Sequence, residues 1–195
     1  MSKCPSGISK RPNTATPSAA VLSKTAATMI PFYCKIACDA RYAREWSKAV
    51  ASADLGKLIR LFRRATRIRN PMLSTNSIGY FLDLSFPPPL YLYTNGTSQR
   101  AGTAQFRFSA KAHRHIAAAI LPLYLTIRDS KPFAGALANA IRLRKRKIIE
   151  QLVRSRVRSP YLRHVELIHA GFAMGYRVPG VKGTYYNDFF REIMG

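Results

Sequence analysis

Acidic residues are scarce in this chain, and their scarcity limits what the chain can do. Nine Asp and Glu stand against 32 Lys and Arg, so the net charge is +23 at pH 7. The acidic residues form no D-x-D or E-x-x-E pair that could hold the two metal ions of a phosphoryl-transfer enzyme. Self-repulsion at such a charge destabilises a compact protein, and a polyanionic partner is the usual reason for it. Candidate partners are nucleic acid, an anionic membrane surface and an acidic protein assembly, and a generally basic composition is the remaining explanation.

Cysteine is also rare, which excludes a disulfide framework. The chain has three cysteines, Cys4, Cys34 and Cys38, so we predict a reducing, cytoplasmic compartment. A zinc site from Cys34, Cys38, His113 and His115 has suitable ligand types, but two histidines separated by one residue diverge on a helix. We therefore predict two core thiols, two surface histidines, and no metal site.

Motifs of the common catalytic classes are missing. The chain has no G-x-S-x-G, Walker loop, dinucleotide fingerprint or H-E-x-x-H. The nearest acid/base group is Glu166 with His164 and His169. On a strand, Glu166 and His164 would share one face and His169 would point to the other. We predict no enzymatic activity, no cofactor and no small-molecule substrate.

The first 30 residues differ in composition from the rest. They are rich in Ser, Thr, Ala and Pro and contain no acidic residue, so we predict a disordered tail. A cationic arm and an organelle transit peptide are alternative interpretations of residues 1–30, so organelle import stays open. Residues 31–195 are long enough for one domain. The longest apolar run, Ile116 to Leu125, is too short to cross a bilayer.

The segment 78–109 is nearly neutral and rich in aromatic and branched residues, which is typical of a sheet. We predict a strand at 78–85 that ends at three prolines, and a hairpin of 90–93 with 103–108 around Asn95-Gly96. The loop 94–102 has no assigned role. Residues 164–178 are predicted as one long strand or a hairpin around Gly171, and the C-terminus as a short helix capped by Asn187.

Amphipathic helices are predicted on both sides of this segment, over 32–51, 55–67, 110–127 and 133–158. Pro122 predicts a kink or break in the third helix. The helix 55–67 has the clearest pattern, with Asp54 as its N-cap and Leu58 and Phe62 on the apolar side. The predicted fold is therefore α+β, with a small antiparallel sheet covered by basic amphipathic helices and a disordered N-terminal tail.

Positive charge is concentrated in two segments, 54–70 and 111–160, which together supply +15 of the +23. A solvated helix face ordinarily mixes charges of both signs, whereas these faces are almost uniformly cationic. The predicted polyanion-binding residues are Lys57, Arg60, Arg63, Arg64, Arg67, Arg142, Arg144, Lys145, Arg146, Lys147, Arg154, Arg156 and Arg158.

The charge distribution predicts a non-enzymatic binder of nucleic acid, DNA or RNA, which contacts phosphates with low sequence specificity. An alternative is a structural or peripheral protein that docks on an anionic membrane or an acidic protein assembly. The basic amphipathic helix 55–67 is equally typical of membrane-surface helices.

Overall fold

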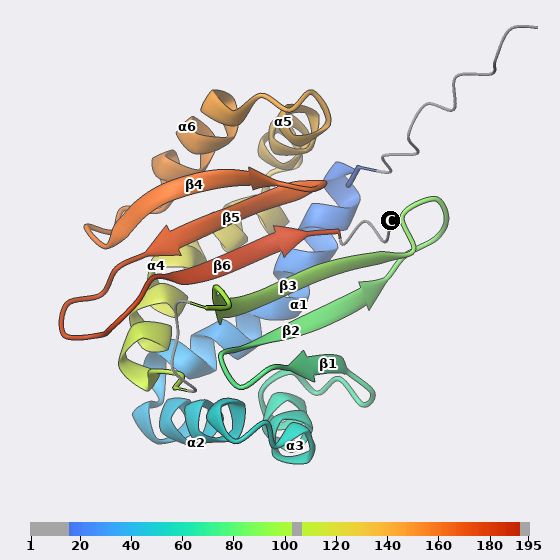
Figure 1. The fold of residues 1–195 in the computed structure, drawn as a ribbon. Coiled ribbons are helices and arrows are strands. Elements are labelled where there is room, and N and C mark those ends of the chain that lie inside the picture. The colour runs from blue at the N-terminus through green and yellow to red at the C-terminus, as the bar shows by residue number, and fades with distance from the viewer. Residues whose placement is uncertain (1–15, 103–106, 192–195) are drawn as a thin grey trace, which may run out of the picture.

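The fold is α+β: one antiparallel sheet with helices packed against one of its faces (Figure 1). A computed structural model describes residues 16–102 and 107–191 of the chain. The elements in chain order are α1 (Ala19–Cys38), α2 (Ala40–Ala51), α3 (Leu55–Thr66), β1 (Met72–Thr75), β2 (Gly79–Ser85), β3 (Leu92–Gln99), α4 (Ala110–Asp129), α5 (Lys131–Arg142), α6 (Arg146–Arg156), β4 (Leu162–Ile168), β5 (Gly171–Tyr176) and β6 (Tyr185–Phe190).

The element order repeats, because three helices and three strands are followed by three more of each. The sheet order is β1-β2-β3-β6-β5-β4, so the two sets of strands meet at β3 and β6 in mirrored order. Adding 91 to the bounds of α1 and α2 gives the bounds of α4 and α5. The chain is therefore built from two copies of one unit, which we call the first repeat (19–99) and the second repeat (110–190).

The strand registers support an approximate two-fold axis between the repeats. Tyr80 pairs with Thr97 in the first repeat, and Phe172 pairs with Phe189 in the second, each residue 92 positions later. The central pair places Gly96 opposite Asp188, which are themselves 92 apart. The axis therefore passes through the middle of the β3–β6 ladder.

The repeats share the local signals that start their helices. Ser18 caps α1 by accepting from the Val21 amide, and Ser109 caps α4 by accepting from the Ala112 amide. A side-chain oxygen at this position satisfies an amide that has no acceptor within the helix. In the same way, α2 and α5 begin at the caps Asp39 and Ser130. These signals fix the first residues of the four helices.

A closed ring of hydrogen bonds lies where the repeats meet in the core. The Tyr33 hydroxyl donates to Asn95 Oδ1 at 2.9 Å, and Asn95 Nδ2 donates to the Tyr124 hydroxyl at 2.8 Å. The Tyr124 hydroxyl donates to Asn187 Oδ1, and Asn187 Nδ2 donates back to the Tyr33 hydroxyl, both at 2.8 Å. All four side chains are fully buried. Each hydroxyl gives one bond and accepts one, so the ring leaves none of these groups unsatisfied.

The ring corrects the prediction for residues 94–102. Asn95 and Gly96 are not a hairpin turn but lie in the middle of β3, which pairs with β2 and β6. The amide of Asn95 is satisfied inside the core, so a residue type that usually marks turns is stable in a central strand. Residues 103–106 of the other predicted strand lie outside the described residues.

The C-terminal prediction was also wrong, because Asn187 lies in strand β6 and caps no helix. The alternative of a hairpin for residues 164–178 is confirmed, with β4 and β5 joined at His169 and Ala170. The sheet is larger than the segment 78–109 that was expected to form it. The strand β1 completes one edge and was not predicted.

The helix boundaries correct three further predictions. The tail predicted over residues 1–30 is wrong from Ala19 onward, because α1 buries Leu22 and Met29 in the core; residues 1–15 lie outside the described residues. The helix predicted over 133–158 is two helices separated at 143–145. Pro122 causes no break, since α4 continues through it. Helix 55–67 is confirmed with its Asp54 cap.

Candidate nucleic-acid interface

The cations predicted on α3 lie on its solvent side. Arg60, Arg63, Arg64 and Arg67 are exposed and Lys57 is half-buried. Within the described residues, none of the five pairs with a carboxylate, and Arg63 donates to the Asn70 side chain at 3.4 Å. This face is therefore cationic without internal neutralisation.

The second group lies at the turn between α5 and α6 and at the C-terminal end of α6. All of its side chains are exposed, and they are Arg142, Arg144, Lys145, Arg146, Lys147, Arg154, Arg156 and Arg158. Of the whole predicted set, only Arg154 has a carboxylate partner among the described residues, Glu150 at 2.8 Å. Arg156 lies over the Phe133 ring at 5.5 Å. Most of this charge is therefore available to an external anion.

The structure does not bring the two groups into one patch. Helix α3 packs beside β1 and helix α6 packs beside β4, and these strands are the opposite edges of the sheet (Figure 1). The two-fold relation explains this separation, because α3 and α6 are equivalent elements of the two repeats. Each group must be considered as a separate surface.

The turn before α6 differs sharply from its counterpart in the first repeat. Residues 142–147 read Arg-Leu-Arg-Lys-Arg-Lys, whereas the equivalent residues 51–56 read Ala-Ser-Ala-Asp-Leu-Gly. The backbone is the same, since Ala53 and Arg144 have φ values of 51° and 52°. The fold forms this turn without cations in one repeat, so packing does not explain the five cations in the other.

The start of α6 also lacks the cap that its counterpart has. Asp54 accepts from the Lys57 amide at 2.8 Å, whereas Lys145 has nearly the same dihedral angles and makes no side-chain cap. Cations at a helix N-terminus oppose the helix dipole, and the first amides of a helix attract anions. The turn 142–147 thus combines exposed cations with an uncapped helix N-terminus.

The apolar side of α3 is used by the protein itself. Leu58, Leu61 and Phe62 are buried in the core, which accounts for the amphipathic pattern of residues 55–67. No helix in the described part of the chain is long and apolar enough to cross a membrane. The pattern that suggested a membrane-surface helix is therefore explained by folding.

The two cysteines and His113 are placed differently from the prediction, whereas His115 is exposed as predicted. Cys34 and Cys38 are exposed, and His113 is fully buried with its Nε2 2.8 Å from the Tyr80 hydroxyl. Burial lowers the pKa of His113 to about 3, so this ring is neutral. The described residues contain no group of three His, Cys, Asp or Glu side chains that could hold a metal ion.

Sequence reasoning found only Glu166 and His164 of a charged cluster on the sheet face that carries no helices, and it missed Arg100 and Asp188. Glu166 lies 3.4 Å from Arg100 and 3.1 Å from His164, as its place on the same strand face predicts. Arg100 also lies 4.0 Å over the Tyr186 ring. Asp188 lies near them at the two-fold axis and is 2% exposed. Strand alternation around residue 188 is the signal that could have found it, but the prediction of a helix there removed that signal.

Burial raises the pKa of Asp188 to about 6, although the Arg100 guanidinium and a bond from Ser98 oppose the shift. An unfolded Asp ionises near pH 3.8, so the folded carboxyl resists ionisation between these values. The neutral Asp188 carboxyl makes its full contribution to folding stability below pH 3.8, and this contribution is lost as the pH rises through 6. The loss is about 3 kcal/mol, from two pKa units at about 1.4 kcal/mol each.

We predict that Asp188→Asn raises the free energy of unfolding at pH 7 by up to about 3 kcal/mol. The difference between variant and wild type should shrink toward zero at pH 4, where both side chains are neutral. Urea unfolding at several pH values measures it. A difference that stays constant from pH 4 to 7 would contradict the burial explanation.

Comparison of the chain with models of protein families, with curated proteins and with solved structures found no match.

Proposed function

We propose that this protein binds nucleic acid through phosphate contacts, with low sequence specificity, and that the α5–α6 turn at residues 142–147 is the centre of the interface. The observation that carries the proposal is the contrast between the repeats: one backbone turn carries five cations in the second repeat and none in the first. A partner outside the chain explains that contrast, whereas folding does not.

Nucleic acid is favoured over the other polyanions by the form of the surface. The cations at 142–147 project from a turn and an exposed helix start, where separate side chains can reach successive phosphates. A membrane surface would need an apolar helix side for insertion, but the apolar side of α3 is buried. Helix α3 supplies a second cationic surface at the other edge of the sheet.

The test is a titration against duplex DNA, structured RNA and anionic liposomes at several salt concentrations. Phosphate contacts predict that log K falls linearly with log salt, with a slope of about −0.9 per neutralised phosphate on duplex DNA. Binding that is absent at physiological salt for both nucleic acids would overturn the proposal. Salt-resistant binding to liposomes alone would favour the membrane alternative.

One substitution, Lys145→Asp, should change stability and nucleic-acid binding in opposite directions. Lys145→Asp should raise the free energy of unfolding by about 1 kcal/mol, because Asp54 caps the equivalent helix from the same backbone conformation. It should also weaken nucleic-acid binding about tenfold, because a phosphate contact is lost and a negative charge is added.

Both effects of Lys145→Asp are measured on one protein sample, by urea unfolding and by the titration. The mirror substitution Asp54→Lys is the control and should lower stability by about 1 kcal/mol through loss of the cap. If Lys145→Asp stabilises the protein and leaves binding unchanged, the turn is not the centre of the interface.

A further inference from the structure

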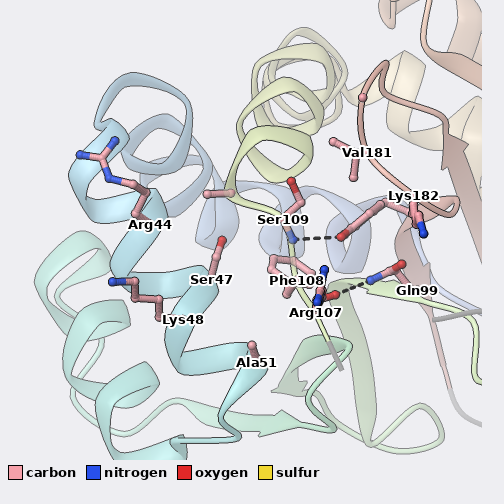
Figure 2. A pocket seen from close by; sticks show the side chains of 13 residues that line it. Arg44, Ser47, Lys48, Ala51, Gln99, Arg107, Phe108, Ser109, Val181 and Lys182 are labelled. Atoms are coloured by element: carbon pink, nitrogen blue, oxygen red, sulfur yellow. Dashed lines mark hydrogen bonds between the residues drawn. The ribbon is translucent and has the colours of Figure 1, made fainter. Parts of the chain in front are cut away.

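A pocket of about 720 Å³ lies between α2, the start of α4 and the loop after β5 (Figure 2). Its volume is in the range that holds small organic ligands. Four cations line it and no acidic residue does, within the described residues. Phe108, Tyr185 and Val181 provide apolar surface, and the cations are Arg44, Lys48, Arg107 and Lys182. The pocket therefore combines an apolar wall with a strongly positive lining.

The start of α4 contributes backbone donors to this pocket. Ser109 and Ala110 line it. The Ser109 amide donates to the Tyr185 hydroxyl at 2.9 Å and the Ala112 amide to the Ser109 side chain at 3.2 Å, so the amides of Ala110 and Lys111 are the ones without an acceptor within the helix. Lys111, in the same turn, is turned away, because its ammonium donates to the Pro179 carbonyl at 3.0 Å. The four lining cations make no ion pair within the described residues. An anion in the pocket would meet both the helix terminus and these cations.

Ser47 is an independent sign that the pocket takes a ligand. Its hydroxyl is buried and has no hydrogen-bond partner, and the side chain is 5% exposed and lines the pocket. A helical serine or threonine ordinarily bonds the carbonyl four residues earlier, as Thr25 and Thr66 do here. Because a buried hydroxyl without a partner is costly, a ligand acceptor is a natural partner for Ser47.

The repeats again show that folding does not require these residues. In the second repeat the positions equivalent to Arg44, Ser47 and Lys48 hold glycine, alanine and asparagine. Those equivalents are Gly135, Ala138 and Asn139, all within α5. The same helix forms with neither the cations nor the hydroxyl, so their presence in the first repeat indicates a role beyond packing.

We propose that this pocket binds an organic phosphate of about nucleotide size. The phosphate groups lie against the α4 N-terminus among Arg44, Lys48 and Lys182, and accept a bond from Ser47. The organic part covers Phe108 and Val181. Several cations around one pocket favour phosphate, since it carries more charge and more acceptor oxygens than a single carboxylate. The site is separate from the α5–α6 turn and does not depend on the proposed nucleic-acid function.

The experiment is calorimetric titration with ATP, and with adenosine as the ligand without phosphate, at constant ionic strength. Wild type should bind ATP and not adenosine. Lys48→Asn and Ser47→Ala introduce the residues that stand at the equivalent positions of the second repeat, so both variants should fold normally. Each should weaken ATP binding, by about tenfold for Lys48→Asn and about threefold for Ser47→Ala.

A steric variant and a charge control complete the test. Ala51→Phe fills the pocket without changing charge and should abolish ATP binding; the equivalent position holds Arg142, so the helix accepts a large side chain. Arg146→Ala, at the distant α5–α6 turn, should leave ATP binding unchanged. Urea unfolding confirms that each variant is folded.

The outcomes decide between specific and general binding. The proposal is overturned if millimolar ATP does not bind. It is also overturned if Arg146→Ala weakens binding as much as Lys48→Asn, or if Ala51→Phe still binds ATP, because binding would then follow net charge alone. Loss of nucleic-acid binding in Lys48→Asn with unchanged ATP binding would instead assign these cations to the nucleic-acid interface.

Discussion

Replacing residues 144–147 by Ala-Asp-Leu-Gly, the sequence of the equivalent turn 53–56, should weaken nucleic-acid binding by about 10²–10³-fold at physiological salt. Four cations are lost, and each phosphate contact contributes roughly 0.7 log units there through counterion release. The salt slope should become shallower by about 3 to 4. The measurement is the same titration against duplex DNA at several salt concentrations.

The reciprocal exchange controls for net charge. A protein that carries Ala-Asp-Leu-Gly at 144–147 and Arg-Lys-Arg-Lys at 53–56 has the composition and charge of the wild type. If the position of the charge decides binding, affinity stays low in this double exchange. Recovery of wild-type affinity would show that the turn is not special and that total charge governs binding.

Tyr33→Phe should lower the free energy of unfolding by about 1–3 kcal/mol, because one buried acceptor of the hydrogen-bond ring loses its donor. The hydroxyl donates to Asn95 Oδ1 and accepts from Asn187 Nδ2. Its loss leaves the buried Asn95 oxygen without this donor, whereas Asn187 Nδ2 keeps the Gly96 carbonyl and the Thr97 hydroxyl as acceptors. An unsatisfied buried acceptor costs about 1–3 kcal/mol. Urea unfolding of the two proteins measures the difference.

Tyr93→Phe is the matched control for Tyr33→Phe. Tyr93 is also fully buried in β3, but its hydroxyl has no hydrogen-bond partner. Removal of this oxygen should change stability by no more than about 0.5 kcal/mol, or should stabilise the protein. Equal losses of stability in the two variants would mean that the hydrogen bonds contribute nothing beyond the packing of the aromatic side chains.

The ring and the repeat explain how the two halves form one core. The ring uses one tyrosine from each long central helix and one asparagine from each central strand. Each bond joins a tyrosine to an asparagine, and two of the four bonds, Asn95 to Tyr124 and Asn187 to Tyr33, cross between the repeats. A buried polar network is stable only when each group is satisfied, so this junction should specify how the repeats pair.

The repeat could have been predicted from the chain, but composition and periodicity did not point to it. The signals are matched single residues about 91 or 92 positions apart: Pro31 with Pro122, Tyr33 with Tyr124, Gly79 with Gly171 and Asn95 with Asn187. Most other positions differ. Comparison of the chain with itself at that spacing would have corrected the tail, the terminal helix and the loop 94–102.

Local sequence was sufficient for some elements. Asp54, the 3.6-residue apolar period and the exposed cations correctly placed helix 55–67, because a cap and one buried stripe fix a surface helix. The alternation at 78–85 correctly placed strand β2. The concentration of positive charge is likewise a property of the sequence alone.

Only the tertiary structure decided where that charge lies and what surrounds it. The two-fold arrangement sends α3 and α6 to opposite edges of the sheet, and it makes Asn95 and Asn187 core residues. The pocket beside Ser47 needs α2, α4 and the loop after β5, which lie far apart in the sequence. Local sequence patterns indicate the helix or strand to which a residue belongs. Which residues it contacts across the core depends on which elements pack together, and that is decided by long-range packing.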